Sequence, residues 1–249
     1  RVSPQPWQDD WFATPGPREL ARTLWRGVEA QHRVASMRLV DTLDEQAELE
    51  RLLEAGKPPL PAAAQGLHYL LATPFRYRSK HASRFRRGGE LGIWYGAEEK
   101  FTACAEVGYW RWRFLMDSEG LRGGELITEH TLFQARVRGR CIDLTRPPWS
   151  AAAVAWTQPM DYGACQAVAA AARGHGVQWL RYASARRTGG RCGAVLDATA
   201  LALPATPRVE TWVCKVGPGG ALMLHEQERL TVAIDADGAI STSTSTSTS

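Results

Sequence analysis

The sequence predicts an α+β fold in a single domain, with mixed or antiparallel sheets and flanking helices. The chain has 249 residues, of which 44% are hydrophobic, so it is long enough to bury one sizeable core. Segments typical of strands outnumber those typical of helices, and they follow one another as hairpins rather than alternating with helices. This order favours α+β over a doubly wound parallel sheet.

The first half of the chain predicts two helices set among strands and loops. Thr42 and Glu45 form a capping box at the start of the first helix, and Gly56 with Pro58 supplies its stop signal. A proline-containing segment follows and is typical of a loop. We expect, in order, a strand at 23–28, a helix over about 42–55, a loop over 57–65, a buried strand at 91–95 and a second helix over 98–116.

The second half predicts antiparallel strands on either side of a third helix, because apolar and polar residues alternate there. An alanine-rich run forms this helix, which Gly174 and Gly176 end. We expect strands at 126–137 and 141–144, the helix over about 161–173, and strands at 177–182, 193–197, 210–216, 221–226 and 229–234.

We expect one main domain that is flanked by an additional segment at each end. Residues 22–200 form that domain, with 1–21 as an N-terminal extension and 201–240 as further strands packed on it. Residues 241–249 alternate Ser and Thr and offer no side chain that could fill a core. We interpret these residues as an artefactual tail and leave them out of the fold prediction.

Composition and motifs exclude several classes of protein. The longest apolar runs have six residues, far below the roughly 20 that cross a bilayer, so we expect a soluble protein. The chain begins without a charged and apolar leader, which makes the cytoplasm the expected location. Five widely spaced cysteines fit neither a disulfide framework nor a zinc site, so we expect no metal. Phosphate-loop, HExxH, GxSxG and GxGxxG motifs are missing, which disfavours kinases, zinc proteases, common serine hydrolases and ordinary dehydrogenases.

Glu106 is the first candidate for a functional side chain. It lies at the edge of an apolar stripe of the helix expected over 98–116, and no cation stands three or four residues away from it. A carboxylate near apolar groups needs either a distant partner or a function. Two interpretations stay open: a long-range structural salt bridge and a catalytic role.

A basic segment precedes this helix. Residues 76–87 contain six of the 30 Lys and Arg residues, so we expect either a solvated loop or a site for an anion. Arg84, Tyr95 and Glu106 follow one another at intervals of eleven residues, and this order favours a cleft shared by a loop, a strand end and a helix. The basic residues of the segment are Arg76, Arg78, Lys80, Arg84, Arg86 and Arg87.

A polar, glycine-punctuated turn follows the strand expected at 177–182. It contains Ser184 and Arg186 and ends in Gly189-Gly190. Loops at strand ends commonly carry binding residues, and no His and Asp stand in triad order with Ser184. We expect Ser184 either to position a ligand or to close the turn.

Together these segments resemble the RES domain family. The resemblance covers about residues 22–200. One departure is Ala82-Ser83-Arg84-Phe85-Arg86, where the family often has Gly-Gly-Arg-Trp-Asn. The matching segments are Leu24-Trp25-Arg26-Gly27, Ser83-Arg84-Phe85, Ile93-Trp94-Tyr95-Gly96-Ala97, Thr102-Ala103-Cys104-Ala105-Glu106, and Tyr182-Ala183-Ser184-Ala185-Arg186 with Gly189-Gly190.

The resemblance implies a bacterial toxin with an ADP-ribosyltransferase-like fold that consumes NAD and is neutralised by an Xre-like antitoxin. NAD is then the substrate, and residues 22–200 are the NAD-processing domain. Cleavage of the nicotinamide–ribose bond builds positive charge on the sugar, which a carboxylate stabilises, and Arg forks bind phosphate oxygens. The implied catalytic residues are Glu106, Arg84 and Ser184, and the implied NAD-binding residues are Arg26, Arg84, Tyr95, Ser184 and Arg186.

Three questions stay open at this point. Arg76 or Arg78 could replace Arg26 as the upstream phosphate ligand. The acceptor of ADP-ribose could be water, phosphate or a cellular protein. A nucleic-acid-binding module that uses residues 76–87 is the further alternative, although we expect the tryptophans that could stack on bases to lie in the core, namely Trp25, Trp94, Trp110, Trp179 and Trp212.

Overall fold

The structure is a computed structural model that describes residues 5–30, 42–235 and 237–246. Its helices are α2 (Leu43–Ala55), α3 (Tyr69–Arg76), α4 (Lys100–Asp117), α5 (Ala153–Thr157) and α6 (Gly163–Gly174). Its strands are β1 (Arg18–Glu29), β2 (Trp94–Ala97), β3 (Leu126–Asp143), β4 (Trp179–Ala183), β5 (Arg191–Val195), β6 (Leu201–Ala202), β7 (Val209–Gly217), β8 (Gly220–His225), β9 (Glu228–Ile234) and β10 (Ile240–Thr246).

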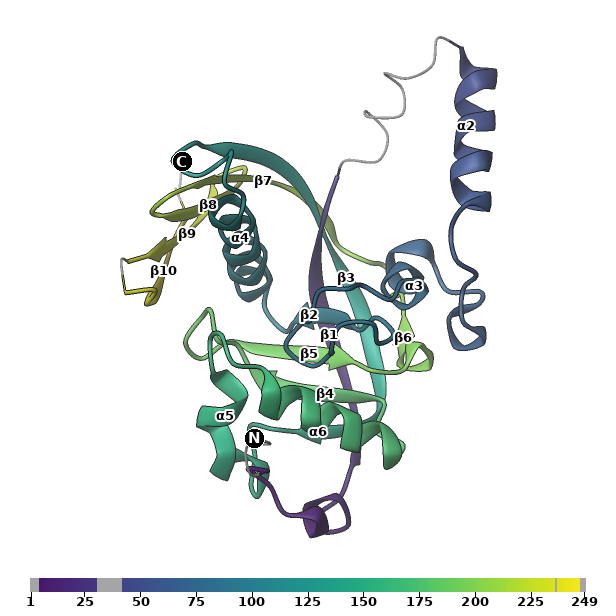
Figure 1. Ribbon diagram of the computed structural model, residues 1–249, viewed down its shortest axis with the longest axis vertical. Helices are drawn as coiled ribbons and strands as arrows, with labels where there is room; N and C mark the ends of the chain where they lie inside the picture. Colours follow the sequence, from purple (N-terminus) through teal and green to yellow (C-terminus); the bar gives the residue numbers. More distant parts are fainter. Residues whose placement is uncertain (1–4, 31–41, 236, 247–249) are drawn as a thin grey trace.

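All of these strands belong to one ten-stranded sheet (Figure 1). β1, β2, β5, β4 and β3 are neighbours in that order, and β3 also pairs with β1, so these five strands close into a ring. β7, β8, β9 and β10 continue the sheet from β3 as antiparallel neighbours. The pairing of β3 with β4 is parallel. The predicted α+β fold with a mixed sheet is therefore confirmed.

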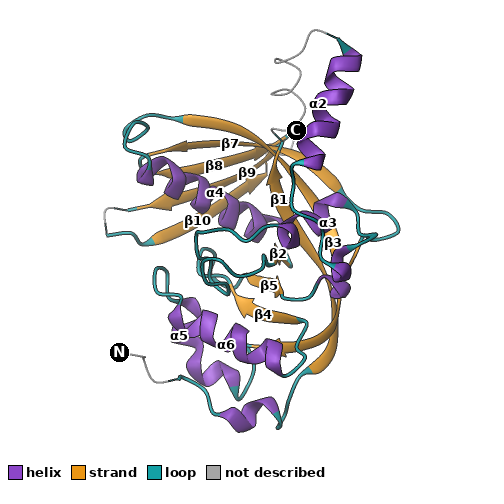
Figure 2. Ribbon diagram, turned by 45° about the vertical axis from the view of Figure 1, so that its right-hand side comes forward, coloured by secondary structure: helices purple, strands orange, loops and turns teal. Residues whose placement is uncertain are grey.

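Helices cover two parts of this sheet. α4 contacts β7, β8 and β9 as well as β1, and Gly108 permits its close approach because a Cβ atom there would lie 3.0 Å from the Cβ atom of Ala221. α5 and α6 lie together beside β4, while α2 stands apart from the body (Figure 2). None of the helices in the described ranges combines the length and apolar character that a membrane crossing requires.

Two expectations about β3 and the chain end differ from the structure. The strands expected at 126–137 and 141–144 are one continuous strand, because Gly139 passes through the predicted break with a φ of 156° and leaves room for Gln178. Residues 241–246, which we left out of the fold prediction, form all but the first residue of β10 on the edge of β9. Alternating Thr and Ser can pair as a strand without filling a core, since the side chains from Ser241 to Thr246 are exposed or half-buried. The artefactual origin of the tail stays a prediction.

Other boundaries follow the sequence closely. The helix expected over 42–55 begins after Thr42, and the capping box with Glu45 is present, so this prediction is confirmed. The helices expected over 98–116 and 161–173 occur as α4 and α6. α3 was not predicted, because Pro74 lies inside this short helix. The five cysteines are all buried and free.

Candidate functional site

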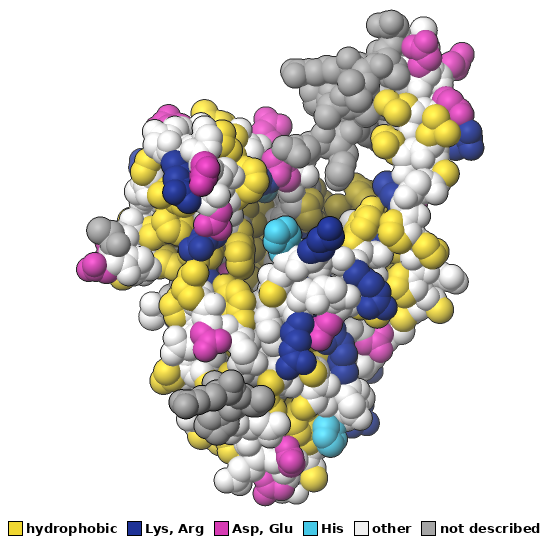
Figure 3. All heavy atoms as spheres, viewed as in Figure 1, with side chains coloured by type: hydrophobic (Ala, Val, Ile, Leu, Met, Phe, Trp, Pro, Cys, Tyr) yellow, Lys and Arg dark blue, Asp and Glu magenta, His cyan; other side chains and the backbone are white. Residues whose placement is uncertain are grey.

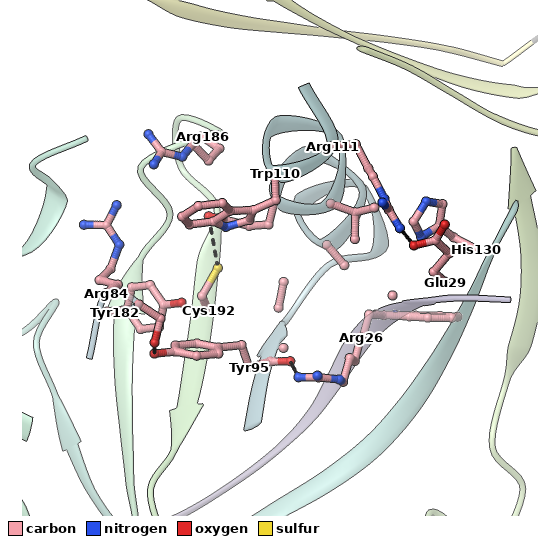
Figure 4. A pocket seen from close by; sticks show the side chains of 18 of the residues that line it. Arg26, Glu29, Arg84, Tyr95, Trp110, Arg111, His130, Tyr182, Arg186 and Cys192 are labelled. Carbon is pink, nitrogen blue, oxygen red and sulfur yellow. Dashed lines mark hydrogen bonds and ion pairs between the residues drawn. The ribbon is translucent and has the colours of Figure 1, made fainter. Parts of the chain in front are cut away.

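A cavity of about 440 Å³ lies between β1 and α4. β1 contributes residues from Trp25 to Glu29, and α4 contributes residues from Ala103 to Phe114. The loop before β2, β2 itself, β3, β4, β5 and the turn between β4 and β5 complete the walls. Figure 4 shows Arg84, Tyr182, Cys192 and Arg186 together at one end, Glu29, Arg111 and His130 at the other, and Trp110 between them.

Glu106 projects from α4 into the cavity and is held there by Ser184. The hydroxyl of Ser184 donates a 2.7 Å hydrogen bond to Glu106 Oε1. The same hydroxyl accepts the backbone N–H groups of Arg186 and Arg187, at 3.1 and 3.2 Å. Ser184 therefore closes its turn and also orients the carboxylate of Glu106. Its role in positioning a ligand stays a prediction.

Cys192 also contacts the carboxylate. Its thiol lies 3.9 Å from Glu106 Oε1. Burial, and next the charge of Glu106, raise the pKa of this thiol well above its usual value. Cys192 therefore stays protonated and presents an S–H group to the carboxylate.

Arg186 is a buried guanidinium without an acidic partner among the described residues. Its side chain is 2% exposed, and its Nη2 donates to Pro159 O and to the Tyr162 hydroxyl at 3.0 and 3.2 Å. The guanidinium carbon lies 3.5 Å from the centre of the Tyr109 ring. Nε and Nη1 have no hydrogen-bond partner in the described part of the chain. A buried guanidinium with unpaired N–H groups costs free energy unless a bound anion accepts hydrogen bonds from it.

Arg84 stands beside Arg186 at the same end of the cavity (Figure 4). Its Nη1 donates to the carbonyl oxygens of Trp156 and Gln158, at 3.0 and 2.9 Å, and its guanidinium lies 4.8 Å from the Tyr162 ring centre. The buried Arg84 thus ties the loop before β2 to the end of α5. It contributes a positive charge to the cavity and also holds the wall together.

Arg26 and Tyr95 line the middle of the cavity. Arg26 Nη1 donates a 2.9 Å hydrogen bond to the main-chain oxygen of Tyr95, and burial lowers the pKa of Arg26 to about 10, so it stays charged at neutral pH. The Tyr95 hydroxyl contacts Ser83 Oγ at 2.8 Å and accepts the N–H of Phe85 at 3.1 Å. This hydroxyl therefore fixes the loop that carries Arg84.

The basic segment 76–87 divides into buried and exposed members. Arg86 is buried and donates to the carbonyl oxygens of Ser79 and His81, so it stabilises its own loop. Arg76 pairs with Glu54. Neither Arg76 nor Arg78 is among the residues that line the cavity, whereas Arg26 is. A group of Lys and Arg side chains is visible on the face shown in Figure 3.

Sequence reasoning missed one end of the cavity and misplaced one aromatic residue. Glu29, Arg111 and His130 were not predicted, because β1, α4 and β3 bring them together only in the fold: Glu29 stands opposite His130 in the β1–β3 pairing. Trp110 was expected in the core, but it is 45% exposed and faces the cavity. The spacing of four residues from Glu106 could have indicated this, since such residues share a helix face.

One further cluster has the composition of a metal site. Glu210, His225 and Glu228 bring ligand atoms within 4.8 Å of one another. Lys100 pairs with both Glu210 and Glu228, so its ammonium already offsets one of their two negative charges. The cluster lies outside the cavity, and the arrangement is that of a half-buried ion-pair network.

Comparison with known proteins gives one family. The RES domain profile matches residues 59–216, which is more than half of the chain. No curated protein matches the chain. Among solved structures, a chain of the M. tuberculosis MbcT–MbcA toxin–antitoxin complex aligns with a TM-score of 0.46 and 16% sequence identity, covering 88% of this chain and 95% of that chain. By the profile match, the chain belongs to the RES domain family.

Proposed function

We propose that this chain is the toxin of a bacterial toxin–antitoxin pair and that it consumes NAD in the cytoplasm by cleaving the nicotinamide–ribose bond. The arrangement of Glu106 carries this proposal: a carboxylate held by Ser184 faces a cavity whose nearby guanidiniums, Arg84 and Arg186, have no acidic partner in the described ranges. Membership of the RES domain family supports the same activity, because the family resemblance implies action on NAD.

The chemistry of the cleavage matches these groups. As the bond to nicotinamide breaks, positive charge develops on the ribose, and a fixed carboxylate stabilises it. Nicotinamide leaves as a neutral molecule from a cationic ring, so the step needs no general acid. Glu106 is therefore assigned the electrostatic role, and Ser184 holds the carboxylate in the orientation that this role requires.

The cations of the cavity suit the two phosphates of NAD. Arg26 stands in the middle of the cavity, and Arg84 and Arg186 stand at the end that also holds Glu106. Guanidinium forks bind phosphate oxygens in a fixed geometry. Tyr95 lines the cavity beside Arg26 and offers an aromatic wall for the substrate.

The acceptor of the ADP-ribosyl group is the second part of the proposal. We favour water or phosphate, which makes the enzyme an NAD glycohydrolase or phosphorylase, with transfer to a cellular protein as the alternative. The partner that neutralises the toxin is then an Xre-like antitoxin, as the family resemblance implies. Neither step calls for a metal.

A nucleic-acid-binding module is less well supported. Arg84 and Arg86 of the basic segment are buried and bound to carbonyl oxygens, so they are withdrawn from a surface that could follow a phosphate backbone. Trp94, Trp179 and Trp212 are fully buried and offer no face to a base.

Mass spectrometry after incubation with NAD tests the proposal. The purified chain is incubated with NAD alone, with added phosphate and with cell lysate. Free ADP-ribose, ADP-ribose 1″-phosphate or an ADP-ribosylated protein would identify water, phosphate or a protein as the acceptor. Intact NAD in all three reactions, together with binding to nucleic acid that weakens steeply with salt, would replace the proposal by the nucleic-acid alternative.

A further inference from the structure

The cavity is longer than one nucleoside. Eleven residues separate Ala103 from Phe114 on α4, a rise of about 16 Å, and the β1 wall from Trp25 to Glu29 spans about 13 Å. Glu106 stands near one end of the α4 wall and Phe114 at the other, about 12 Å further along the helix. A dinucleotide with its reacting ribose at Glu106 therefore has room to extend toward Phe114.

The two ends of the cavity differ in charge. Arg84 and Arg186 give the Glu106 end two cations against one carboxylate. At the far end, defined by Glu29, Arg111, Phe114 and His130, the carboxylate of Glu29 pairs with Arg111. Burial, and next the charge of Arg111, lower the pKa of His130 to about 4, so its ring is uncharged at neutral pH. The far end is therefore polar but close to neutral overall.

Partly exposed aromatic side chains line the cavity from its middle to the far end. Trp110 and Phe114 lie one helical turn apart on α4, line the cavity and are 45% and 51% exposed. Exposed aromatic rings beside a cavity are a platform on which a flat base can stack, a contact worth about 1–3 kcal/mol per base. Of these two residues, Trp110 is nearer to Glu106 along the helix. Phe114 lies beyond it, at the far end that also holds the Glu29–Arg111 ion pair.

We propose that the far end binds the adenosine half of NAD, with adenine stacked on Phe114 and the ribose hydroxyls facing Glu29. This inference rests on the proposed function, which places the nicotinamide end at Glu106. A near-neutral, hydrogen-bonding end with an aromatic rim suits an uncharged nucleoside, whereas the phosphates meet Arg26 in the middle of the cavity. A carboxylate is also the group that accepts hydrogen bonds from a ribose diol.

The same arrangement assigns a preference for NAD over NADP. The 2′-phosphate of NADP would lie beside Glu29, and the cation of the far end, Arg111, is already paired with that carboxylate. Repulsion by Glu29 disfavours the additional phosphate. We expect kcat/KM for NADP to be at least about tenfold below that for NAD.

Nicotinamide release from two substrates tests the adenosine site. NAD contains the adenosine half, and nicotinamide mononucleotide lacks it. In Phe114→Ala we expect KM for NAD to rise about tenfold, with KM for the mononucleotide unchanged, because stacking on the base is lost. Phe114→Leu tests the ring itself. Leu121→Ala is the matched control, since Leu121 is 41% exposed just beyond α4 and does not line the cavity.

Direct binding gives a second readout. Calorimetry with ADP-ribose, which carries adenosine but no nicotinamide, should show a dissociation constant about tenfold higher for Phe114→Ala than for the wild type or Leu121→Ala. Since Phe114 is half-exposed, the variant is expected to fold, and circular dichroism checks this.

The outcomes separate this inference from the proposed function. If the wild type releases no nicotinamide from NAD, the proposed function fails. If it cleaves NAD but Phe114→Ala leaves both KM for NAD and ADP-ribose binding unchanged, only the adenosine site is overturned. An equal rise of KM for NAD and for the mononucleotide would assign Phe114 to the nicotinamide half and would also overturn it.

Discussion

Ser184 Oγ donates a 2.7 Å hydrogen bond to Glu106 Oε1 across 78 residues of sequence, and this bond joins the β4–β5 turn to the middle of α4. The hydroxyl donates its hydrogen to the carboxylate and accepts hydrogen bonds from the backbone N–H groups of Arg186 and Arg187. The orientation of the carboxylate is therefore fixed by the same turn that places Arg186 in the cavity. Because of this bond, Ser184 and Glu106 can be tested as a coupled pair.

Replacing Glu106 by Gln should lower kcat for nicotinamide release by about 10²-fold or more. The amide keeps the size of the side chain but not the charge that stabilises the developing positive ribose. Initial rates with NAD and a thermal unfolding curve for the variant give the measurement and the folding control. Turnover within about threefold of the wild type would remove Glu106 from the reaction.

Replacing Ser184 by Ala should lower kcat by about tenfold and reduce the free energy of unfolding by about 1 kcal/mol, because the carboxylate and two backbone N–H groups lose their partner. If the effect on kcat passes through Glu106, Ser184→Ala should cost little in a chain that already carries Glu106→Gln. A double-mutant cycle on kcat measures this coupling. Additive losses would show that Ser184 acts on the substrate independently of Glu106.

Replacing Arg84 by Ala should weaken NAD binding and also destabilise the fold. The loss of two hydrogen bonds from a charged donor to Trp156 O and Gln158 O is expected to cost about 2 kcal/mol. Arg84→Lys keeps the positive charge but not the planar fork, so it should recover part of the stability and little of the affinity. Calorimetry with NAD and urea unfolding separate the two effects. An unchanged dissociation constant in Arg84→Ala would contradict the role in phosphate binding.

The sequence predicted the parts of the site that belong to short, local patterns. Glu106 stood out because no cation stands three or four residues away from it in the helix, and the Ser184 turn stood out by its glycines. The burial of Arg84 and Arg86 could not be predicted in this way, because their partners are carbonyl oxygens, which any residue carries. A basic run with buried members looks the same in sequence as a solvated one.

The far end of the cavity shows a second limit of sequence reasoning. Glu29 meets His130 through the register of β1 on β3, and Arg111 of α4 pairs with Glu29 in the same part of the cavity. No spacing rule relates residues this far apart in the chain, so only tertiary structure reveals the cluster. Register depends on the whole pattern of buried residues along both strands rather than on the two residues that meet.

Adding a methyl group at Gly27, on the β1 wall of the cavity, should destabilise the protein. A Cβ atom there would lie 2.7 Å from Val107 Cγ2 and 3.3 Å from Leu132 Cδ1, so Gly27→Ala should cost about 1–3 kcal/mol of unfolding free energy. Removing the crowded methyl groups with Val107→Ala in the same chain should restore part of this loss. Urea unfolding of the single variants and the pair measures it. Equal losses with and without Val107→Ala would mean that β1 moves instead of the side chain.

His130 should make the stability of the protein fall in mild acid. Burial, and next the charge of Arg111, lower its pKa in the folded state from 6.5 to about 4, so between these values the unfolded chain binds the proton and the folded chain does not. Stability is therefore lost as the pH falls below about 6.5, and this loss amounts to about 2 kcal/mol between pH 7 and pH 5. His130→Gln removes the titrating group and retains a partner for Thr128, which lies 2.9 Å from His130 Nε2. Urea unfolding at the two pH values should show a smaller loss in the variant than in the wild type, and equal losses would mean that His130 protonates as readily in the folded protein as in the unfolded chain.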